Sequence, residues 1–381
     1  MTLKPNDKEL NLEFLELVKA GLWDYLPDNK LFSESTDWKR IYDLSQTQSL
    51  SGIVLDGINK LPKELLPPRA LYIKWCAEIL HIEDENLRLD KEVANLFSLL
   101  RSYEIEPVLM KGQAIAKLYP EPTHRASGDI DIYIGKENYD KVNKILSNEG
   151  EALEKWSPKH IMYKWHEVII ENHRLIGKMI SPRLNRKLHS LVDEWHLTGN
   201  TDSMVIAGTR ITILPLDFNI VFLLLHSVIH LMGFGIGLRQ ICDWAIILNR
   251  YKDQINRPYV KILLKKLGLT KASKIFGALS VNYLGLPKED LIIPYSNKDE
   301  HQAELLLEDI LHNGNFGFSG ERGKNRRGNW IKKINNFLRT SKRSWQLRLI
   351  APEEAFWKPY HKFSTFVDIR IYRFKNLSKK H

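Results

Sequence analysis

Apolar residues recur at three- and four-residue spacing through most of the first hundred positions, which is the period of an amphipathic helix. Helices are predicted from Leu10 to Tyr25, from about Asp37 to Leu61, and from Pro68 to Arg101. The third of these mixes acidic and basic residues on its outer face. Segment 1–104 is therefore predicted to be an N-terminal helical region, and we find no catalytic motif in it.

The spacing changes to a strand period after Pro107. A short apolar run, Val108 to Met110, leads into a Lys-Gly pair, and residues 129–134 read Asp-Ile-Asp-Ile-Tyr-Ile. Alternation of β-branched and polar residues is typical of a half-buried strand. Further predicted elements are helices at 113–118 and 137–146 and strands at 167–176 and 204–214. This mixture of strands and helices makes 105–215 a compact α/β core.

Helical spacing returns after residue 215. Helices are predicted at 218–231, 238–250, 260–283 and 301–312. Segment 216–381 is thus predicted to be a C-terminal helical domain. The whole chain is predicted to have an α+β fold, in which a small mixed sheet is flanked by N-terminal helices and by this helical domain.

The composition is that of a folded, water-soluble protein. The chain is 43% hydrophobic and 27% charged, and its two cysteines, Cys76 and Cys242, cannot form a disulfide framework. The first residues show no basic segment followed by an apolar run, so we expect a reducing, cytoplasmic location. The apolar stretch Phe218–Leu238 could span a bilayer by length, but His226 and His230 favour a buried helix, and we expect no membrane span.

The net charge of +10 indicates an anionic partner, which could be nucleotide, nucleic acid, anionic saccharide or a membrane surface. Ten basic residues and no acidic ones lie between Arg322 and Arg348, with Trp330, Phe337 and Trp345 among them. This mixture suits contacts with nucleic-acid phosphates and bases, so nucleic acid is a possible partner of the segment. Amphipathic helices with solvated basic faces are the alternative.

Asp129 and Asp131 are the first candidates for chemistry. Residues two apart in a strand point to the same face with Cα atoms about 6.5 Å apart, so these carboxylates project together. Paired carboxylates can converge on Mg²⁺, which prefers oxygen ligands. The alternative is that Asp129 ends a loop and Asp131 faces water.

A glycine turn precedes this strand at a suitable distance. Lys111 and Gly112 follow an apolar run and lead into a predicted helix, an arrangement in which backbone N–H groups can bind phosphates. The lysine would add a positive charge there. The turn lies about 16 residues before the aspartates, which is enough for a short helix and a return loop. Together the two features favour a functional site over the structural alternative.

At this point the sequence resembles a little-characterised bacterial nucleotidyltransferase family within the DNA polymerase beta-like superfamily. The resemblance is carried by Leu109-Met110-Lys111-Gly112, Leu118-Tyr119-Pro120, Arg125, Gly128-Asp129-Ile130-Asp131 and, in the helical half, Leu225-His226, His230, Gly237-Leu238-Arg239 and Asp243. It implies an α+β nucleotidyltransferase core and a Mg²⁺ cofactor. The phosphate-binding residues it implies are Lys111, Gly112, Gln113, Arg125, Ser127 and Gly128.

The superfamily also implies a third acidic ligand on a neighbouring strand. Glu171 is the best match, since it begins an acidic-x-His signature that ends at His173. It would complete a metal triad with the two aspartates, or act as base for the incoming hydroxyl. His173 points to the same side and could orient the site, contact substrate or be structural. Asp193 and Glu194, in a predicted helix, are the fallback.

Two further pairs share helical spacing. His226 and His230 are four residues apart and could bind zinc, but no third ligand is evident, which favours a packing or phosphate-contact role. Arg239 and Asp243 have the spacing of an i,i+4 ion pair. Alternatively, Arg239 could reach a nucleotide phosphate.

The leading hypothesis is therefore a Mg²⁺-dependent enzyme that moves a nucleoside monophosphate from an NTP to a hydroxyl-bearing acceptor and releases pyrophosphate. The turn reads Lys-Gly-Gln where many superfamily members have Gly-Ser or Gly-Gly. This departure motivates an alternative, a non-catalytic nucleotide- or nucleic-acid-binding protein. The basic segment motivates a third hypothesis, a nucleotidyltransferase toxin that modifies tRNA or protein. The acceptor and the choice of NTP are open.

Overall fold

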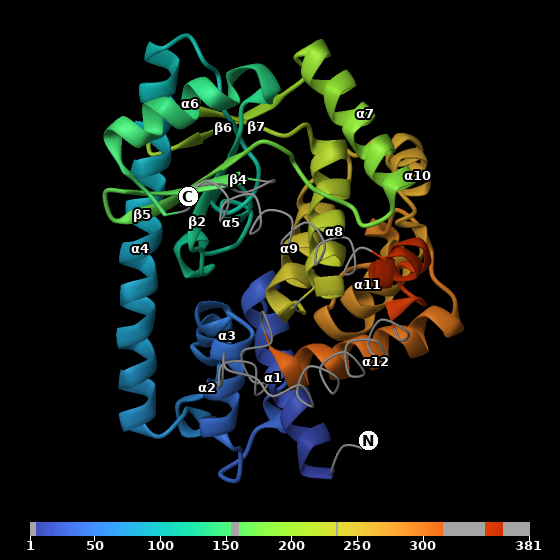
Figure 1. The fold of residues 1–381 in the computed structure, drawn as a ribbon. Coiled ribbons are helices and arrows are strands. Elements are labelled where there is room, and N and C mark those ends of the chain that lie inside the picture. The colour runs from blue at the N-terminus through green and yellow to red at the C-terminus, as the bar shows by residue number, and fades with distance from the viewer. Residues whose placement is uncertain (1–4, 154–159, 234, 315–346, 361–381) are drawn as a thin grey trace, which may run out of the picture.

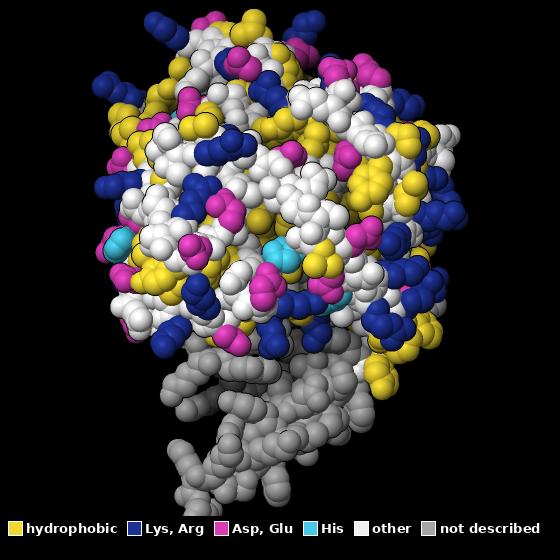
Figure 2. Space-filling view, turned by 90° about the horizontal axis from the view of Figure 1, so that it is seen from above, with side chains coloured by type: hydrophobic (Ala, Val, Ile, Leu, Met, Phe, Trp, Pro, Cys, Tyr) yellow, Lys and Arg dark blue, Asp and Glu magenta, His cyan; other side chains and the backbone are white. Residues whose placement is uncertain are grey.

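A seven-stranded mixed sheet and a large set of helices form the molecule, and the predicted α+β fold is confirmed (Figure 1). The structure is a computed structural model that describes residues 5–153, 160–233, 235–314 and 347–360. The basic segment predicted to contact nucleic acid therefore lies almost entirely outside the described residues. On the face shown in Figure 2, Lys and Arg side chains are mixed with Asp and Glu over most of the surface and are more frequent toward its lower right edge.

The sheet has the order β3-β4-β5-β2-β1-β7-β6. Its strands are β1 (Val108–Leu109), β2 (Asp129–Tyr133), β3 (Glu151–Ala152), β4 (His160–Trp165), β5 (Val168–His173), β6 (Asp202–Ile206) and β7 (Thr209–Ile213). The central strand β2 pairs in parallel with β5 and antiparallel with β1. The sheet is therefore mixed, as the sequence predicted.

One predicted strand region differs from the structure, and two observed strands were not predicted. The alternating segment 204–214 is a hairpin of β6 and β7, because Ala207 and Gly208 both have positive φ, as in a type I′ turn. The alternation continues on both sides of this turn, which hides it in the sequence. Strands β3 and β4 were not predicted from the sequence.

The helices mostly follow the predicted spacing. They are α1 (Pro5–Trp23), α2 (Trp38–Thr47), α3 (Ser51–Ile58), α4 (Arg69–Ser102), α5 (Gln113–Ala116), α6 (Gly135–Glu149), α7 (Pro182–Thr198), α8 (Leu216–Gly233), α9 (Leu238–Arg250), α10 (Arg257–Lys266), α11 (Thr270–Leu284) and α12 (Asn297–Asn313). Residues 352–360 are also helical. The predicted single helices at 37–61 and 260–283 are each two helices, because Ser49 and Gly268 adopt positive φ and end the first helix of each pair.

Helix α4 joins the two ends of the molecule (Figure 1). Its first half contributes Trp75 and Ile79 to the main core, and its second half packs Val93 and Phe97 against the sheet. Helix α6 covers the same face of the sheet with Val142. The opposite face of the sheet is therefore turned toward the helical half of the protein.

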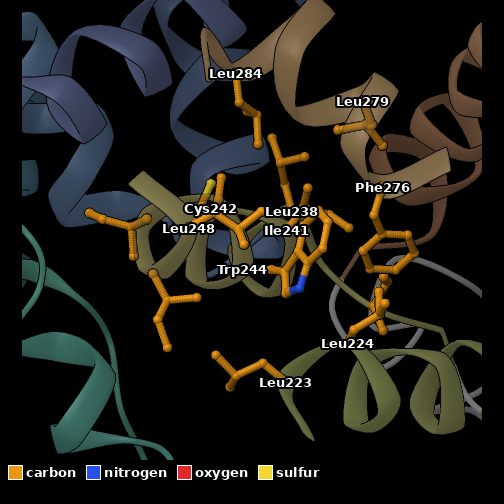
Figure 3. Packing of buried hydrophobic residues seen from close by; sticks show 14 of the residues in the cluster. Leu223, Leu224, Leu238, Ile241, Cys242, Trp244, Leu248, Phe276, Leu279 and Leu284 are labelled. Carbon is orange, nitrogen blue, oxygen red and sulfur yellow. The ribbon is translucent and has the colours of Figure 1, made fainter. Parts of the chain in front are cut away.

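The main core lies around Trp244 of α9 (Figure 3). The indole packs edge-on to Phe276 of α11, and its Nε1 donates to the Ile220 carbonyl of α8. Helices from segment 1–104 join this core, since Trp23 donates a hydrogen bond to the Leu284 carbonyl. Segments 1–104 and 216–381 thus share one hydrophobic core.

Helix α8 crosses the centre of this core. Among the described residues it is the one helix long and apolar enough to cross a membrane, and 67% of it is buried inside the protein. Core helices of folded proteins have the same composition. Its apolar sequence is accounted for by packing in the core.

The loop before β2 is held against α3 and α4 by His124, which lies in the short helix η3 (Pro122–His124). Its Nδ1 lies 2.7 Å from Asp56 Oδ1, and its Nε2 lies 2.7 Å from Glu83 Oε1. Gly52 allows this approach, because a Cβ there would lie 2.3 Å from the His124 carbonyl oxygen. Burial lowers the pKa of His124, but hydrogen bonds to Asp56 and Glu83, together with the charges of Asp56 and Glu121, outweigh it and raise the pKa to about 9.

We predict a pH-dependent contribution of His124 to the free energy of unfolding, which solvent screening reduces to roughly 1–2 kcal/mol. The folded protein holds the proton more tightly than the unfolded chain, whose His pKa is near 6.5. The contribution is therefore complete below pH 6.5 and is lost as the pH rises through about 9. Chemical denaturation of wild type and His124→Gln across this range measures it. His301→Gln is the surface control, and a wild-type-minus-His124→Gln difference that is constant with pH would contradict the prediction.

Candidate active site

Strands β2 and β5 bring the three predicted carboxylates together. Asp131 is the direct cross-strand partner of Glu171, and Asp129 lies two residues earlier on the same face. One oxygen from each of the three carboxylates lies within 4.8 Å of the others. Ile130 and Ile132 point the other way, into the core formed with α4 and α6. Alternation along one strand thus separates the acidic side chains from the apolar ones.

The three carboxylates differ in their exposure to solvent. The Asp131 side chain has no exposed surface and that of Glu171 is 16% exposed, whereas 37% of the Asp129 side chain is exposed. A ligand can therefore reach the carboxylates past Asp129. The fallback residue Asp193 lies elsewhere, in a surface ion pair with Lys136.

Two positive groups face the three carboxylates. Lys111 Nζ lies 3.0 Å from Asp131 Oδ2 and 3.9 Å from Asp129 Oδ2. His173 Nε2 lies 2.8 Å from Asp131 Oδ1 and 3.1 Å from Glu171 Oε2. These contacts neutralise much of the negative charge that the fold concentrates at one point.

The pKa values follow from this arrangement. Burial lowers the pKa of Lys111, but the charges of Asp131, Asp129 and Glu171 outweigh it and raise the pKa above its ordinary value. Burial also lowers the pKa of His173, yet hydrogen bonds to Asp131 and Glu171 raise it to about 9. For Glu171, burial raises the pKa, and the contact with His173 more than reverses this and leaves the pKa below its usual range. All three groups are charged at neutral pH.

The glycine turn packs directly beneath the carboxylates. Gly112 has φ 61° and ψ −115°, the conformation of the first central residue of a type II′ turn, and Ala114 N donates to the Lys111 carbonyl. A Cβ on Gly112 would lie 3.3 Å from the Asp129 carbonyl oxygen. Only glycine therefore fits this turn without strain.

The Gln113 side chain faces away from the carboxylates. Its Nε2 donates to Asp90 Oδ1 at 2.7 Å and to the Asn86 carbonyl at 3.2 Å, both on α4. A phosphate contact by Gln113, which stays a prediction, would use its backbone N–H. Helix α5 after the turn has only four residues, so its dipole is small.

Arg125 forms a buried ion pair with the helical half of the protein. Its Nε and Nη2 donate to the two carboxylate oxygens of Asp243 at 2.8 and 2.7 Å, and its Nη1 donates to Ser127 Oγ. Tyr119 also donates to Asp243. This pairing positions the loop that leads to β2, and a phosphate contact by Arg125 or Ser127 stays a prediction. A Cβ added at Gly128, the next residue, would have no described atom within 4 Å.

Arg239 does not form the expected i,i+4 pair, because Asp243 is bound by Arg125 instead. Its Nη1 donates to the Ala126 carbonyl, and its buried Nε has no hydrogen-bond partner among the residues that the structure describes. Burial and the neighbouring Arg125 lower its pKa, while Asp243 and Asp129 act in the opposite sense.

The two histidines of α8 are separate from the carboxylate cluster. The rings of His226 and His230 are 4.4 Å apart between centroids. Among the described residues, two groups of His, Cys, Asp and Glu have metal-ligand spacing, and neither contains these histidines. The second group adds His160 of β4 to Glu171 and His173, and sequence reasoning missed His160 because it missed the strand.

The mixed α+β fold, the carboxylates on adjacent central strands and the preceding glycine turn are the features that the sequence resemblance leads us to expect. A family of uncharacterised nucleotidyltransferases matches residues 34–285, which include the whole sheet, and the chain belongs to this family. This membership agrees with the resemblance seen in the sequence.

Other comparisons add little. No curated protein matches the chain. A similar solved structure is an antigenic nucleotidyltransferase-like protein from Paracoccidioides brasiliensis, 13% identical, covering 56% of this chain and 96% of its own. Its TM-score is 0.34, which is a weak structural similarity.

We predict that Asp243→Asn lowers the free energy of unfolding by about 3–5 kcal/mol, because it leaves Arg125 buried without its counter-charge and close to Arg239. Urea denaturation measures the change. Asp43→Asn is the matched control, since the Lys39–Asp43 pair is exposed and its loss should change the free energy of unfolding by about 1 kcal/mol or less. Equal effects of the two substitutions would contradict the prediction.

Proposed function

We propose that this protein is a Mg²⁺-dependent nucleotidyltransferase that moves a nucleoside monophosphate from an NTP to a hydroxyl-bearing acceptor and releases pyrophosphate. The observation that carries the proposal is the convergence of Asp129, Asp131 and Glu171 to within 4.8 Å, beside a glycine turn with a lysine. Membership in a nucleotidyltransferase family supports the general reaction class. A cytoplasmic location is part of the proposal.

The carboxylate cluster fits a magnesium ion by its chemistry. Mg²⁺ prefers oxygen ligands and is usually held by a few carboxylates together with water and substrate phosphates. Asp129, Asp131 and Glu171 supply only oxygen donors and open to solvent at Asp129, where phosphates can arrive. When bound, the ion would neutralise developing charge on the phosphate oxygens.

The protein's own groups supply positioning and charge. Lys111 stays protonated because of the surrounding carboxylates, so it can contact a phosphate as a point charge. Backbone N–H groups of Gly112 and Gln113 lie on the same turn. The lowered pKa of Glu171 keeps it ionised, so it can hold the metal or accept the proton of the incoming hydroxyl.

Arg239 is the further phosphate contact in this proposal. Its Nε has no hydrogen-bond partner within the described residues, and it lies beside the loop 125–128. A buried guanidinium nitrogen without a partner is energetically unfavourable, and an anionic oxygen would satisfy it. Arg125, Ser127 and Gly128 then shape the loop around this contact, whether or not they touch the phosphate.

The acceptor stays open in this proposal. If the acceptor is nucleic acid, as in the toxin hypothesis, residues 322–348 are the expected contact. A gel-shift series with tRNA at increasing salt tests this part. Absence of binding at low salt would remove it and leave the reaction class untouched.

We predict that Asp129→Asn and Asp131→Asn each abolish Mg²⁺-dependent pyrophosphate release from labelled NTPs in the presence of cell lysate as a source of acceptor. Each substitution removes a charged metal ligand while it preserves side-chain size, so circular dichroism should be unchanged. Asp140→Asn, on the exposed face of α6, is the control and should retain turnover. Retained turnover in both site variants would reject the assignment.

The non-catalytic alternative predicts different results for the same purified protein. Calorimetry with NTPs, with and without Mg²⁺, would then show metal-independent binding, and no pyrophosphate would be released by the wild-type protein. This combination would replace the proposed transferase with a binding protein.

A further inference from the structure

A second group of metal-ligand side chains lies beside the carboxylate triad and shares one member with it. His160 on β4 and His173 on β5 are direct cross-strand partners, and Glu171 lies two residues from His173 on the same face. One ligand atom from each of the three lies within 4.8 Å of the others. The pairing of β4 with β5 therefore brings this group together, in the same way as the pairing of β2 with β5 brings the carboxylate triad together.

The distances suit a small tetrahedral ion. His160 Nδ1 lies 3.5 Å from Glu171 Oε2, and His173 Nε2 lies 3.1 Å from the same oxygen. Zinc bonds of about 2.1 Å in a tetrahedral site place ligand atoms about 3.4 Å apart. The two observed distances lie on either side of this value. The imidazole rings are 4.8 Å apart between centroids and tilted by 58°, so they can turn toward a common centre.

The donor set distinguishes this group from the magnesium triad. Two imidazoles and one carboxylate favour zinc or a similar transition metal, whereas Mg²⁺ prefers oxygen donors alone. His160 has no role in the proposed phosphoryl chemistry, yet the fold places it at ligand distance from Glu171. Three protein ligands leave a fourth position for water, an anion or substrate.

We propose that His160, Glu171 and His173 form a second cation site, selective for zinc-like transition metals. Glu171 belongs to both groups, and His173 Nε2, which would bind the ion after releasing its proton to solvent, is the nitrogen that now contacts Asp131. Zinc occupancy therefore withdraws Glu171 from the triad and inhibits Mg²⁺-dependent turnover. The inhibitory consequence rests on the proposed function, whereas zinc binding itself does not.

The binding test uses the purified full-length chain with Co²⁺ as a spectroscopic probe and Zn²⁺ as competitor. We expect visible absorption of the tetrahedral type that Zn²⁺ displaces, and at least a tenfold loss of Co²⁺ affinity in His160→Ala and in the more conservative His160→Gln. Asp129→Asn, which removes a triad ligand that the second site does not share, and the surface control His301→Ala should retain the His160-dependent Co²⁺ absorption. Thermal unfolding of each variant confirms that the fold is retained.

Two results would overturn the second site. One is unchanged Co²⁺ affinity in both folded His160 variants. The other is loss of Co²⁺ binding in Asp129→Asn, which would place the ion in the triad.

The inhibition test compares turnover with and without micromolar Zn²⁺ for each variant against its own zinc-free rate. We expect wild type to be inhibited and His160→Gln to be at least tenfold less sensitive. Equal sensitivity of the two would contradict the shared role of Glu171. Zinc binding in a protein that shows no Mg²⁺-dependent turnover would reject the proposed function and leave the second site standing.

Discussion

Parallel, in-register pairing of β2 with β5 is the constraint on which the site depends, because it places Asp131 directly beside Glu171. A shift of one residue would turn Glu171 and His173 into the core and bring Ile170 and Asn172 to the functional face. The register is enforced from the other side, where Ile130, Ile132 and Ile170 pack under α4 and α6. Hydrophobic burial on one face of the sheet thus fixes the position of the charges on the other.

Concentrating three carboxylates at one point is unfavourable unless positive groups lie nearby. Lys111 comes from the glycine turn before β2, and His173 comes from the end of β5, so both counter-charges are held by the same sheet. The Arg125–Asp243 pair then connects this sheet to the helical half through a buried, bidentate contact. The segment 111–131 therefore contributes to the packing of the sheet, to the charge balance of the site and to the contact between the two halves.

Much of this could be predicted from local sequence. The alternation in Asp129–Ile134 identifies β2 and its two aspartates, and helical spacing identifies α4, α8 and α9 within a few residues. Glu171 was chosen because the family resemblance implies a third acidic ligand, and strand periodicity then puts Glu171 and His173 on one side. These features depend on the spacing of apolar and polar residues within one segment, and this spacing can be read directly from the sequence.

The remainder depends on contacts between distant residues. Asp243 pairs with Arg125, 118 positions away, and no helical spacing could favour this partner over Arg239. Strand β4, which carries His160, is defined by its pairing with β5 and mixes polar with apolar residues on the functional face, so it has a weak pattern of its own. The breaks at Ser49 and Gly268 are single residues with positive φ, which apolar spacing does not reveal.

The central claim is that Asp129, Asp131 and Glu171 jointly bind a divalent metal at the phosphate site. A crystal structure with Mn²⁺ and a non-hydrolysable NTP tests it most directly, because the anomalous signal of manganese locates the ion independently of the atoms around it. The account predicts an anomalous peak in contact with all three carboxylates, with the triphosphate entering past Asp129 near Lys111. A peak elsewhere, or carboxylates that splay apart with no ion between them, would contradict it.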